Sequence, residues 1–441
     1  MPRKLYKFKY VTYCARLLNM HRELQLNPYA GNILIDQLEG IPDRLSALKS
    51  LLYLPEIPGQ LDGIPKHIRL HQLMVIRDLH IPPTIEAQLL QSIDLMVRQG
   101  YRYRDPRFAT TWTAVSGEAR HSNAPLPQAF AAAVEGISGV GKTQACLRCL
   151  NYFQRQTVDH ESFPKLVGGL QQVVRLSVEV PPSGKASDLA RSLMDAWQLA
   201  TGSRRFEYWL SKDRIPDPMR ALDEWRQVAV SHFLGVLHLD EIQNLFKLKS
   251  LKQRTSRQGK TEAPELSIQE DQVLRWLLYL TNSGQIPILF SGTPDGIGAL
   301  TKRLSTLERL NTAGYHAFEP FTDAMASDFR KTFLPQLGQY QYVQNRLAVD
   351  DNLARLLIEL TGGIHRIMIA LWVAAHRVAF ERQDDSLRLQ DFTVAAATWL
   401  APVAPAVAAI RSKDANKMAM YEDLAWRDTN FWAKFWQNPI V

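Results

Sequence analysis

The sequence predicts an α/β fold with a five-stranded parallel sheet, a small helical domain after it and a helical or loop-like N-terminal extension before it. Three observations lead to this fold class. Short apolar runs alternate with helical stretches between residues 129 and 318, which is typical of a parallel sheet. A glycine-rich turn joins the first apolar run to the helix that follows it. Beyond Pro320 the pattern is helical throughout, so we expect the sheet to end there.

The composition excludes several classes of protein. The chain has 441 residues, of which 46% are hydrophobic and 22% charged, as in an ordinary globular protein of two or three domains. Its three cysteines are too few for a disulfide framework or a four-thiolate zinc site, and they fit a reducing cytoplasm. We expect Cys146 and Cys149 to be packing residues. No apolar run reaches the ~20 residues of a membrane span, so we expect no membrane partner.

We expect four segments along the chain. They are an N-terminal extension (1–83), an α/β core (84–320), a helical lid (321–410) and an aromatic tail (411–441). The predicted strands are 129–135, 173–180, 234–239, 286–291 and 316–318. The predicted helices are 84–100, 142–156, 186–200, 267–282, 323–335, 350–361, 364–383 and 389–400. Residues 401–412 are expected to be a linker.

The turn after the first strand matches the phosphate-binding pattern G-x-x-x-x-G-K-[ST] at every fixed position. Its glycines let successive backbone N–H groups face one anion, and the next helix adds positive potential at its N-terminus. We expect Lys142 to reach the β- and γ-phosphates of ATP and Thr143 to bind Mg²⁺. The expected nucleotide contacts in this turn are Gly136, Ser138, Gly139, Val140, Gly141, Lys142, Thr143 and Gln144. The alternative is a glycine-rich turn without a ligand.

The apolar run 234–239 ends in two carboxylates, Asp240 and Glu241. Charges at the tip of a buried strand are costly unless they have partners or a chemical role. We expect Asp240 to hold Mg²⁺ and Glu241 to polarise the attacking water, so ATP hydrolysis is the predicted reaction. The alternative is a strand end with incidental acids. His238, inside the strand, is expected to be a packing residue.

Residues at three other places are candidates for contact with the γ-phosphate. Ser291 and Thr293 follow the fourth strand, and the alternative for them is a plain polar turn. Arg303 and Arg309 precede the last strand, where an arginine can act as a finger in a neighbouring subunit's site; the alternative is simple solvation. Arg366 opens a long lid helix, and we expect it to reach the phosphate from the lid.

This ordered set of motifs is similar to AAA+ ATPases over residues 100–400. A closer resemblance, to the TnsC transposition regulators, adds the N-terminal part. TnsC proteins are TniB-like AAA+ proteins of bacterial transposons, including those coupled to CRISPR effectors. The resemblance is carried by Asn27-Pro28, the Leu/Pro-rich stretch to Pro65, the segment HIRLHQLMVIRDLHIPPTIEAQLL and the loop Gly100-Tyr101-x-x-Arg104-Asp105-Pro106. Asp105 stands where an asparagine is expected, and His365 stands where related proteins often have proline.

The resemblance implies a slow, regulatory ATPase of the bacterial cytoplasm that forms rings or filaments on double-stranded DNA when ATP is bound. It implies two further partners, a TniQ-type target selector and transposase subunits of the TnsA and TnsB type. Tyr101 is included among the expected nucleotide contacts. Two alternatives remain open, a helicase-loader or initiator-type AAA+ ATPase and a signalling ATPase that binds no DNA.

A basic segment follows the acidic strand end. Residues 247–260 contain no acid and six cations, Lys247, Lys249, Lys252, Arg254, Arg257 and Lys260. Repeated cations bind phosphates without reading bases, so we expect contact with DNA here; the alternative is a solvated loop. Lys185 is a second candidate. The aromatic tail, from Tyr421 to Trp436, either docks on a partner or packs on its own domain.

Overall fold

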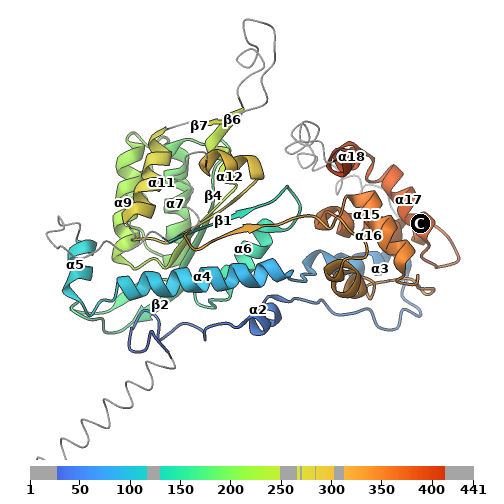
Figure 1. Ribbon diagram of the computed structural model, residues 1–441, viewed down its shortest axis with the longest axis horizontal. Helices are drawn as coiled ribbons and strands as arrows, with labels where there is room; N and C mark the ends of the chain where they lie inside the picture. Colours follow the sequence, from blue (N-terminus) through green and yellow to red (C-terminus); the bar gives the residue numbers. More distant parts are fainter. Residues whose placement is uncertain are drawn as a thin grey trace, which may run out of the picture.

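A computed structural model describes residues 27–116, 130–248, 266–268, 271–283, 285–301 and 312–412. Within this part of the chain, an α/β lobe and a helical lobe lie next to each other along the long axis of the molecule (Figure 1). The predictions for the aromatic tail beyond residue 412 lie outside the described residues. So do the predictions for Lys249, Lys252, Arg254, Arg257, Lys260, Arg303 and Arg309.

The central sheet has five parallel strands in the order β4-β5-β8-β1-β9. The strands are β1 (Ala131–Glu135), β4 (Arg175–Glu179), β5 (Val236–Asp240), β8 (Ile288–Gly292) and β9 (Gly314–Ala317). The predicted five-stranded parallel sheet is therefore confirmed. Strand β8 lies between β1, which leads into the phosphate loop, and β5, which ends in the acids. Because all strands run the same way, these segments meet at one edge of the sheet.

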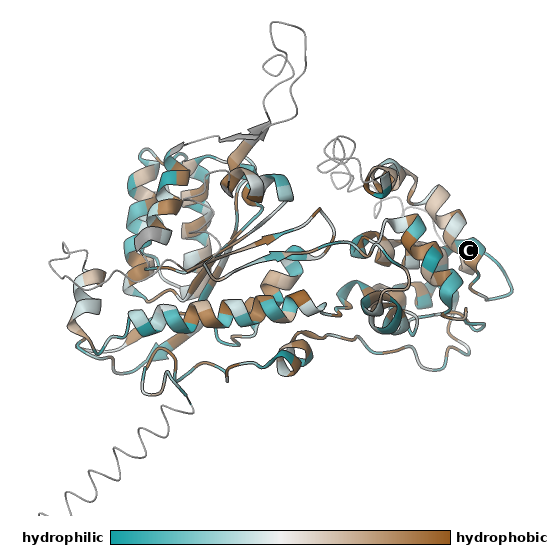
Figure 2. Cartoon of the chain, viewed as in Figure 1, coloured by the Kyte–Doolittle hydropathy of each residue, from teal (hydrophilic) through white to brown (hydrophobic). Residues whose placement is uncertain are grey.

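Helices cover both faces of the sheet. They are α4 (Thr84–Tyr103), α6 (Lys142–Asn151), α7 (Ala186–Thr201), α9 (Pro218–Ser231) and α11 (Asp271–Ser283). On β5, Leu237 and Leu239 pack with α7, α9 and α11, whereas Val236 packs with α4 and α6. Successive side chains of a strand point to opposite faces. A sheet that is covered by helices on both faces therefore needs strands that are apolar at almost every position. Figure 2 shows these strands as mostly hydrophobic.

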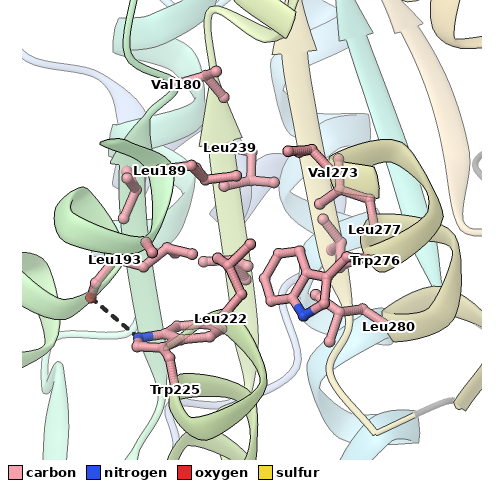
Figure 3. Packing of buried hydrophobic residues seen from close by; sticks show 14 of the residues in the cluster. Val180, Leu189, Leu193, Leu222, Trp225, Leu239, Val273, Trp276, Leu277 and Leu280 are labelled. Atoms are coloured by element: carbon pink, nitrogen blue, oxygen red, sulfur yellow. Dashed lines mark hydrogen bonds between the residues drawn. The ribbon is translucent and has the colours of Figure 1, made fainter. Parts of the chain in front are cut away.

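Helix α9 was not predicted from the sequence, yet it closes one of the two cores. Figure 3 shows Leu222 and Trp225 of α9 between Leu193 of α7 and Trp276 of α11. The indole Nε1 of Trp225 donates a hydrogen bond to the carbonyl oxygen of Leu193 at 3.1 Å. The buried tryptophan therefore keeps a partner for its one polar group.

Two antiparallel hairpins were also not predicted. One consists of β2 (Thr157–His160) and β3 (Leu170–Val173), and the other of β6 (Phe246–Leu248) and β7 (Leu266–Ile268). Strand β7 takes up the first residues of the predicted helix 267–282, which begins at Asp271 instead. Strands of three or four residues are too short for a periodic pattern to be visible in the sequence.

The lid contains α14 (Leu334–Leu337), α15 (Asp351–Thr361), α16 (His365–Phe380), α17 (Leu389–Thr398) and α18 (Ala404–Ser412), after a π-helical turn at Asp328–Phe333. The predicted linker 401–412 is wrong, because α18 and a short 3₁₀ turn occupy it. Its prolines stand in first helical turns, where proline is tolerated, and Val407 packs into the lid core. Among the described residues no single helix is long and apolar enough to span a membrane; two sharply bent helix pairs meet those criteria only jointly.

The described part of the N-terminal extension packs on both lobes and is not a separate unit. Helix α2 (Arg44–Leu51) lies on α4, whereas α3 (Lys66–Leu73) belongs to the lid core. Arg69 of α3 is 4% exposed and pairs with Asp385, with 2.7 Å between Nη2 and Oδ2. The hydroxyl of Tyr340 donates to the carbonyl oxygen of Pro55 at 2.6 Å. The extension therefore connects the lid to the core, which differs from the predicted boundary at residue 83.

Gly363, between α15 and α16, offers a test of how the lid is attached. Its φ is 73°, and an added Cβ would lie 1.8 Å from the carbonyl oxygen of Phe321. We expect Gly363→Ala to destabilise the protein by roughly 2–4 kcal/mol, since backbone strain and steric overlap act together. Thermal unfolding followed by circular dichroism measures the effect.

The matched control is Gly298→Ala in α12 (Pro294–Thr301), an exposed position where an added Cβ meets nothing within 4 Å. Alanine is a better helix former than glycine by about 1 kcal/mol, so we expect no loss of stability. Equal losses in the two variants would contradict the explanation.

Candidate functional site

The phosphate loop connects β1 to α6 at the carboxyl edge of the sheet. Gly139 and Gly141 have φ values of 88° and 103°, which residues with a Cβ rarely adopt. Gly136 is packed so closely that an added Cβ would lie 2.5 Å from the carbonyl oxygen of Phe318. In such a loop, successive N–H groups can face a single anion. The loop therefore fits a bound phosphate.

Lys142 begins α6 and is 6% exposed. Its ammonium donates to the carbonyl oxygen of Ile137 at 3.1 Å. Burial lowers the pKa of Lys142, and the charges of Glu241 and Asp240 oppose that shift. A phosphate at the loop would give the ammonium a charged acceptor, which makes a shorter and stronger hydrogen bond than a carbonyl oxygen does.

Thr143 and Asp240 meet across the edge of the sheet, with the Thr143 hydroxyl donating to Oδ2 of Asp240 at 2.7 Å. Asp240 is 6% exposed. A hydroxyl and a carboxylate are hard oxygen ligands of the kind Mg²⁺ prefers, and Mg²⁺ usually takes few protein ligands besides phosphate and water. The pair therefore fits Mg²⁺, which when bound would neutralise negative charge on the phosphates.

Glu241 follows β5 in a left-handed conformation, with φ 54° and ψ 44°. Such backbone angles are uncommon outside glycine and are retained mainly where the surroundings enforce them, often at functional sites. Burial raises the pKa of Glu241, as does the charge of Asp240, whereas Lys142 lowers it. A raised pKa makes a carboxylate a better proton acceptor. The geometry thus suits the predicted role of polarising water.

Gln243 belongs to this site although the sequence did not single it out. It lies in the 3₁₀ turn Ile242–Leu245, and its Nε2 donates to Oε2 of Glu241. Its Oε1 accepts a hydrogen bond from the backbone N–H of Thr293 at 3.1 Å. The amide thus connects the end of β5 to the end of β8. Its position two residues after Glu241 was the only signal in the sequence, and a glutamine in a turn is not specific.

Ser291 and Thr293 were both predicted to contact the γ-phosphate, and the structure places their side chains in different surroundings. Ser291 has no exposed surface, and its hydroxyl donates to Oδ1 of Asp240. It lies beneath the site as a partner of the metal ligand, so the prediction that it contacts the phosphate is wrong in this structure. Thr293 is 7% exposed, and its Oγ1 accepts from the N–H of Gly296 at 3.3 Å.

His238 lies in the core, as a packing residue does, and its ring is also hydrogen-bonded. It is fully buried, and both ring nitrogens have partners, Ser177 Oγ and Ser291 Oγ, each at 2.8 Å. Burial lowers the pKa of His238 to about 4, so the ring is neutral at physiological pH. Cys146 and Cys149 are buried free thiols, as expected of packing residues.

A cleft of about 1020 Å³ runs from the phosphate loop to the lid. Three parts of the chain line this cleft. The core contributes Gly139, Val140, Gly141 and Gln144, and the segment before α4 contributes His80 and Ile81. The lid contributes Phe321, Arg366 and Trp399. The Arg366 N–H donates to the carbonyl oxygen of Gly139 at 3.2 Å, which joins the lid directly to the phosphate loop. A concave site with apolar walls and a few polar groups fits a small ligand such as a nucleotide.

The predicted nucleotide contacts divide into two groups. Gly136, Ser138, Lys142 and Thr143 lie in the phosphate loop but do not line this cleft. Arg366 lines it, and partial desolvation lowers the pKa of Arg366 while the charge of Glu241 opposes that shift. The charge of Glu241 thus acts on the Arg366 guanidinium, and contact of Arg366 with the γ-phosphate stays a prediction.

Tyr101 does not line the cleft, and the prediction that it contacts the nucleotide is wrong. Helix α4 continues through Tyr101 to Tyr103, three residues beyond its predicted end. This places the ring in the core, where an added Cβ at Gly235 would lie 2.5 Å from the Tyr101 hydroxyl. The neighbouring Arg104 is buried, and its Nη1 donates to the carbonyl oxygen of Leu234 at 2.9 Å. The motif before the phosphate loop thus anchors α4 beneath the sheet.

Removing the charge of Lys142 tests the phosphate site. We expect Lys142→Ala to weaken binding of ATP roughly 10–100-fold, which corresponds to the loss of one or two charge-assisted hydrogen bonds. Fluorescence polarisation of a labelled ATP analogue measures the affinity. Lys185→Ala is the control, because Lys185 is exposed and does not line the cleft. An equal loss in both variants would show a general effect of charge.

The family described as "AAA domain" matches residues 128–300. No curated protein matches the sequence. The chain is similar to a solved structure of Drosophila ORC bound to DNA, with 13% identity and a TM-score of 0.38, over 84% of this chain and 73% of that chain. It is also similar to the Aeropyrum pernix ORC2 protein in ADPNP-ADP complexes, with 14% identity and a TM-score of 0.37, over 62% of each chain. With TM-scores below 0.5, neither likeness supports an inference about this chain. The chain spans less than two thirds of the ORC2 protein.

Proposed function

The chain contains an AAA+ domain, and we propose that it is an ATPase whose nucleotide state controls its assembly on double-stranded DNA. The observation that carries the proposal is the meeting of Thr143 with Asp240, next to Lys142 and Glu241. In the proposed reaction, water attacks the γ-phosphorus of ATP and gives ADP and phosphate. Lys142 binds the phosphates, and Glu241 polarises the water.

The proposed hydrolysis is slow and acts as a timer. Gln243 donates to one carboxylate oxygen of Glu241, so at that oxygen the attacking water competes with the amide for lone pairs. Arg366 approaches from the lid, where it couples lid position to the γ-phosphate. We further propose that Arg303 or Arg309 enters the site of a neighbouring subunit. ATP would then join subunits into a ring or filament, and hydrolysis would release them.

We assign the DNA contact to the β6–β7 hairpin. Lys247 of β6 stands opposite Ser267 of β7, and the segment between the strands carries Lys249, Lys252, Arg254 and Arg257. Strand β6 directly follows the 3₁₀ turn that holds Gln243. The basic segment is thus attached to the element that contacts Glu241, which offers a covalent route between DNA and the nucleotide site. Lys185, exposed ahead of α7, is the second proposed contact.

Within this function we propose a transposition regulator of the TnsC type in the bacterial cytoplasm, with a TniQ-type target selector and TnsA- and TnsB-type transposase subunits as partners. Its support is the order of the N-terminal motifs, from Asn27 to Pro106. The second candidate is an initiator or helicase-loader ATPase, which the phosphate loop, the acidic strand end and the lid arginine fit equally well. The candidates differ in their partner, so binding assays with purified transposase subunits and with a replicative helicase distinguish them.

Electron microscopy with linear duplex DNA tests the assembly step. We expect rings or filaments on DNA with a non-hydrolysable ATP analogue and bare DNA with ADP. Lys142→Ala should prevent assembly with ATP, and Glu241→Gln should prolong it, because the amide binds no proton from water. If both variants assembled equally well without nucleotide, the site would not be a switch.

Salt-dependent binding tests the hairpin. Each cation that neutralises a DNA phosphate adds about 0.9 to the slope of log affinity against log salt, so replacing Lys249 and Lys252 with alanine should make that slope shallower by about 1.8. Fluorescence anisotropy of a labelled duplex gives this slope. The control is the pair Lys49→Ala and Lys331→Ala, two exposed lysines elsewhere, and affinity for ATP should not change in either double variant. An unchanged slope in the hairpin variant would remove the assignment.

A further inference from the structure

A chain of polar side chains lies under the proposed metal site, outside the nucleotide cleft. It runs from Ser177 on β4 to His238 on β5, then to Ser291 on β8 and back to Asp240 at the end of β5. The two contacts of His238 are both 2.8 Å, and Ser291 donates to Oδ1 of Asp240. His238 and Ser291 have no exposed surface. The chain thus joins three adjacent strands.

The register of the sheet explains why these side chains meet. Ser177 is directly opposite His238, and His238 is opposite Leu289, two residues before Ser291. Residues two apart on a strand point to the same face, so His238 and Asp240 share the face that α6 covers. Thr143 of α6 reaches Asp240 from that face. The polar groups therefore form one layer between the sheet and the phosphate loop.

The direction of each hydrogen bond follows from the Asp240 carboxylate, which is the last group in this chain of contacts. A carboxylate only accepts, so the single hydrogen of the Ser291 hydroxyl goes to Asp240. The contact between Ser291 and His238 must then use a hydrogen on Nε2 of the imidazole. In the neutral ring this leaves Nδ1 as an acceptor, and Ser177 must donate to it. The order of donors is fixed from Ser177 to Asp240.

We propose that His238 is a positioning residue for the metal ligand Asp240, acting through Ser291. By donating to Ser291, His238 directs the serine hydrogen onto Oδ1 of Asp240. Oδ2, which accepts from Thr143, is then the carboxylate oxygen that would be available to hold Mg²⁺. This inference rests on the proposed function, because it concerns how the chain binds magnesium nucleotide. Without His238, the Ser291 hydroxyl is free to rotate away, and the Asp240 carboxylate loses a partner that sets its orientation.

Two substitutions separate this role from simple packing. His238→Gln keeps an amide N–H close to the position of Nε2, which can still donate to Ser291. His238→Phe keeps a buried ring but donates nothing. The measurement is the affinity for a fluorescent ATP analogue by polarisation, once with Mg²⁺ and once with EDTA, and the ratio of the two affinities is the magnesium enhancement.

We expect His238→Phe to reduce the magnesium enhancement about 10-fold, as is typical when a partner of a metal ligand is removed, with affinity in EDTA unchanged. His238→Gln should keep most of the enhancement. Ser177→Ala changes little volume at a partly exposed position and should reduce the enhancement a few-fold. If the His238→Phe variant does not fold, the magnesium enhancement of the Ser177→Ala variant tests the inference in its place.

His316→Phe is the matched control. His316 is a buried histidine of β9 whose Nε2 also bonds to a serine, Ser92 of α4, at 3.1 Å. It lies at the edge of the sheet away from β5, so its loss should not change the enhancement. Thermal unfolding of each variant shows whether stability differs.

The outcomes discriminate between the ideas. If His238 only packs, the phenylalanine variant keeps the enhancement and the glutamine variant unfolds at a lower temperature, which overturns the inference. If wild type shows magnesium enhancement that neither His238→Phe nor Ser177→Ala reduces, the inference fails while the proposed function stands. If wild type binds no nucleotide in any condition, the proposed function itself fails.

Discussion

The contact between Thr143 and Asp240 is the interaction on which the rest of the site depends. It joins residues 97 positions apart in the chain, and the parallel sheet, in which β8 lies between β1 and β5, brings the two residues together. The strand order places the phosphate loop and the acidic strand end at one edge. From there Lys142, Glu241 and the lid can act on one phosphate group.

The second constraint is the connection between lid and core. The N–H of Arg366 bonds to Gly139 in the phosphate loop, and the N-terminal segment binds both lobes. The pair of buried Arg69 with partly buried Asp385 favours one specific arrangement of the two segments, since the arginine charge is costly to bury without its partner. The cleft is therefore bounded on three sides, by the core, by the segment before α4 and by the lid. Nucleotide bound there would contact all three, which is a physical basis for coupling nucleotide state to the shape of the subunit.

The phosphate loop and the Asp-Glu pair were predictable because their chemistry lies in contiguous residues with fixed spacing. Gln243 was not, because its role depends on the distance between the ends of β5 and β8. The roles of Ser177, His238 and Ser291 depend on strand register. Tyr101 was assigned wrongly because three more helical residues turned its ring into the core. In each of these cases the information lies in how distant segments meet.

The sequence by itself determined the parallel sheet, the phosphate loop and the paired acids, since local periodicity and spacing specify them. It also located the basic segment that follows the acids. Only the tertiary structure decided that Ser291 faces Asp240 instead of the phosphate and that the N-terminal segment belongs to both lobes. It also showed that the backbone N–H of Arg366 bonds to the carbonyl oxygen of Gly139 in the phosphate loop. Those features follow from strand order and from packing between distant segments, which depend on the whole chain and leave no pattern in neighbouring residues.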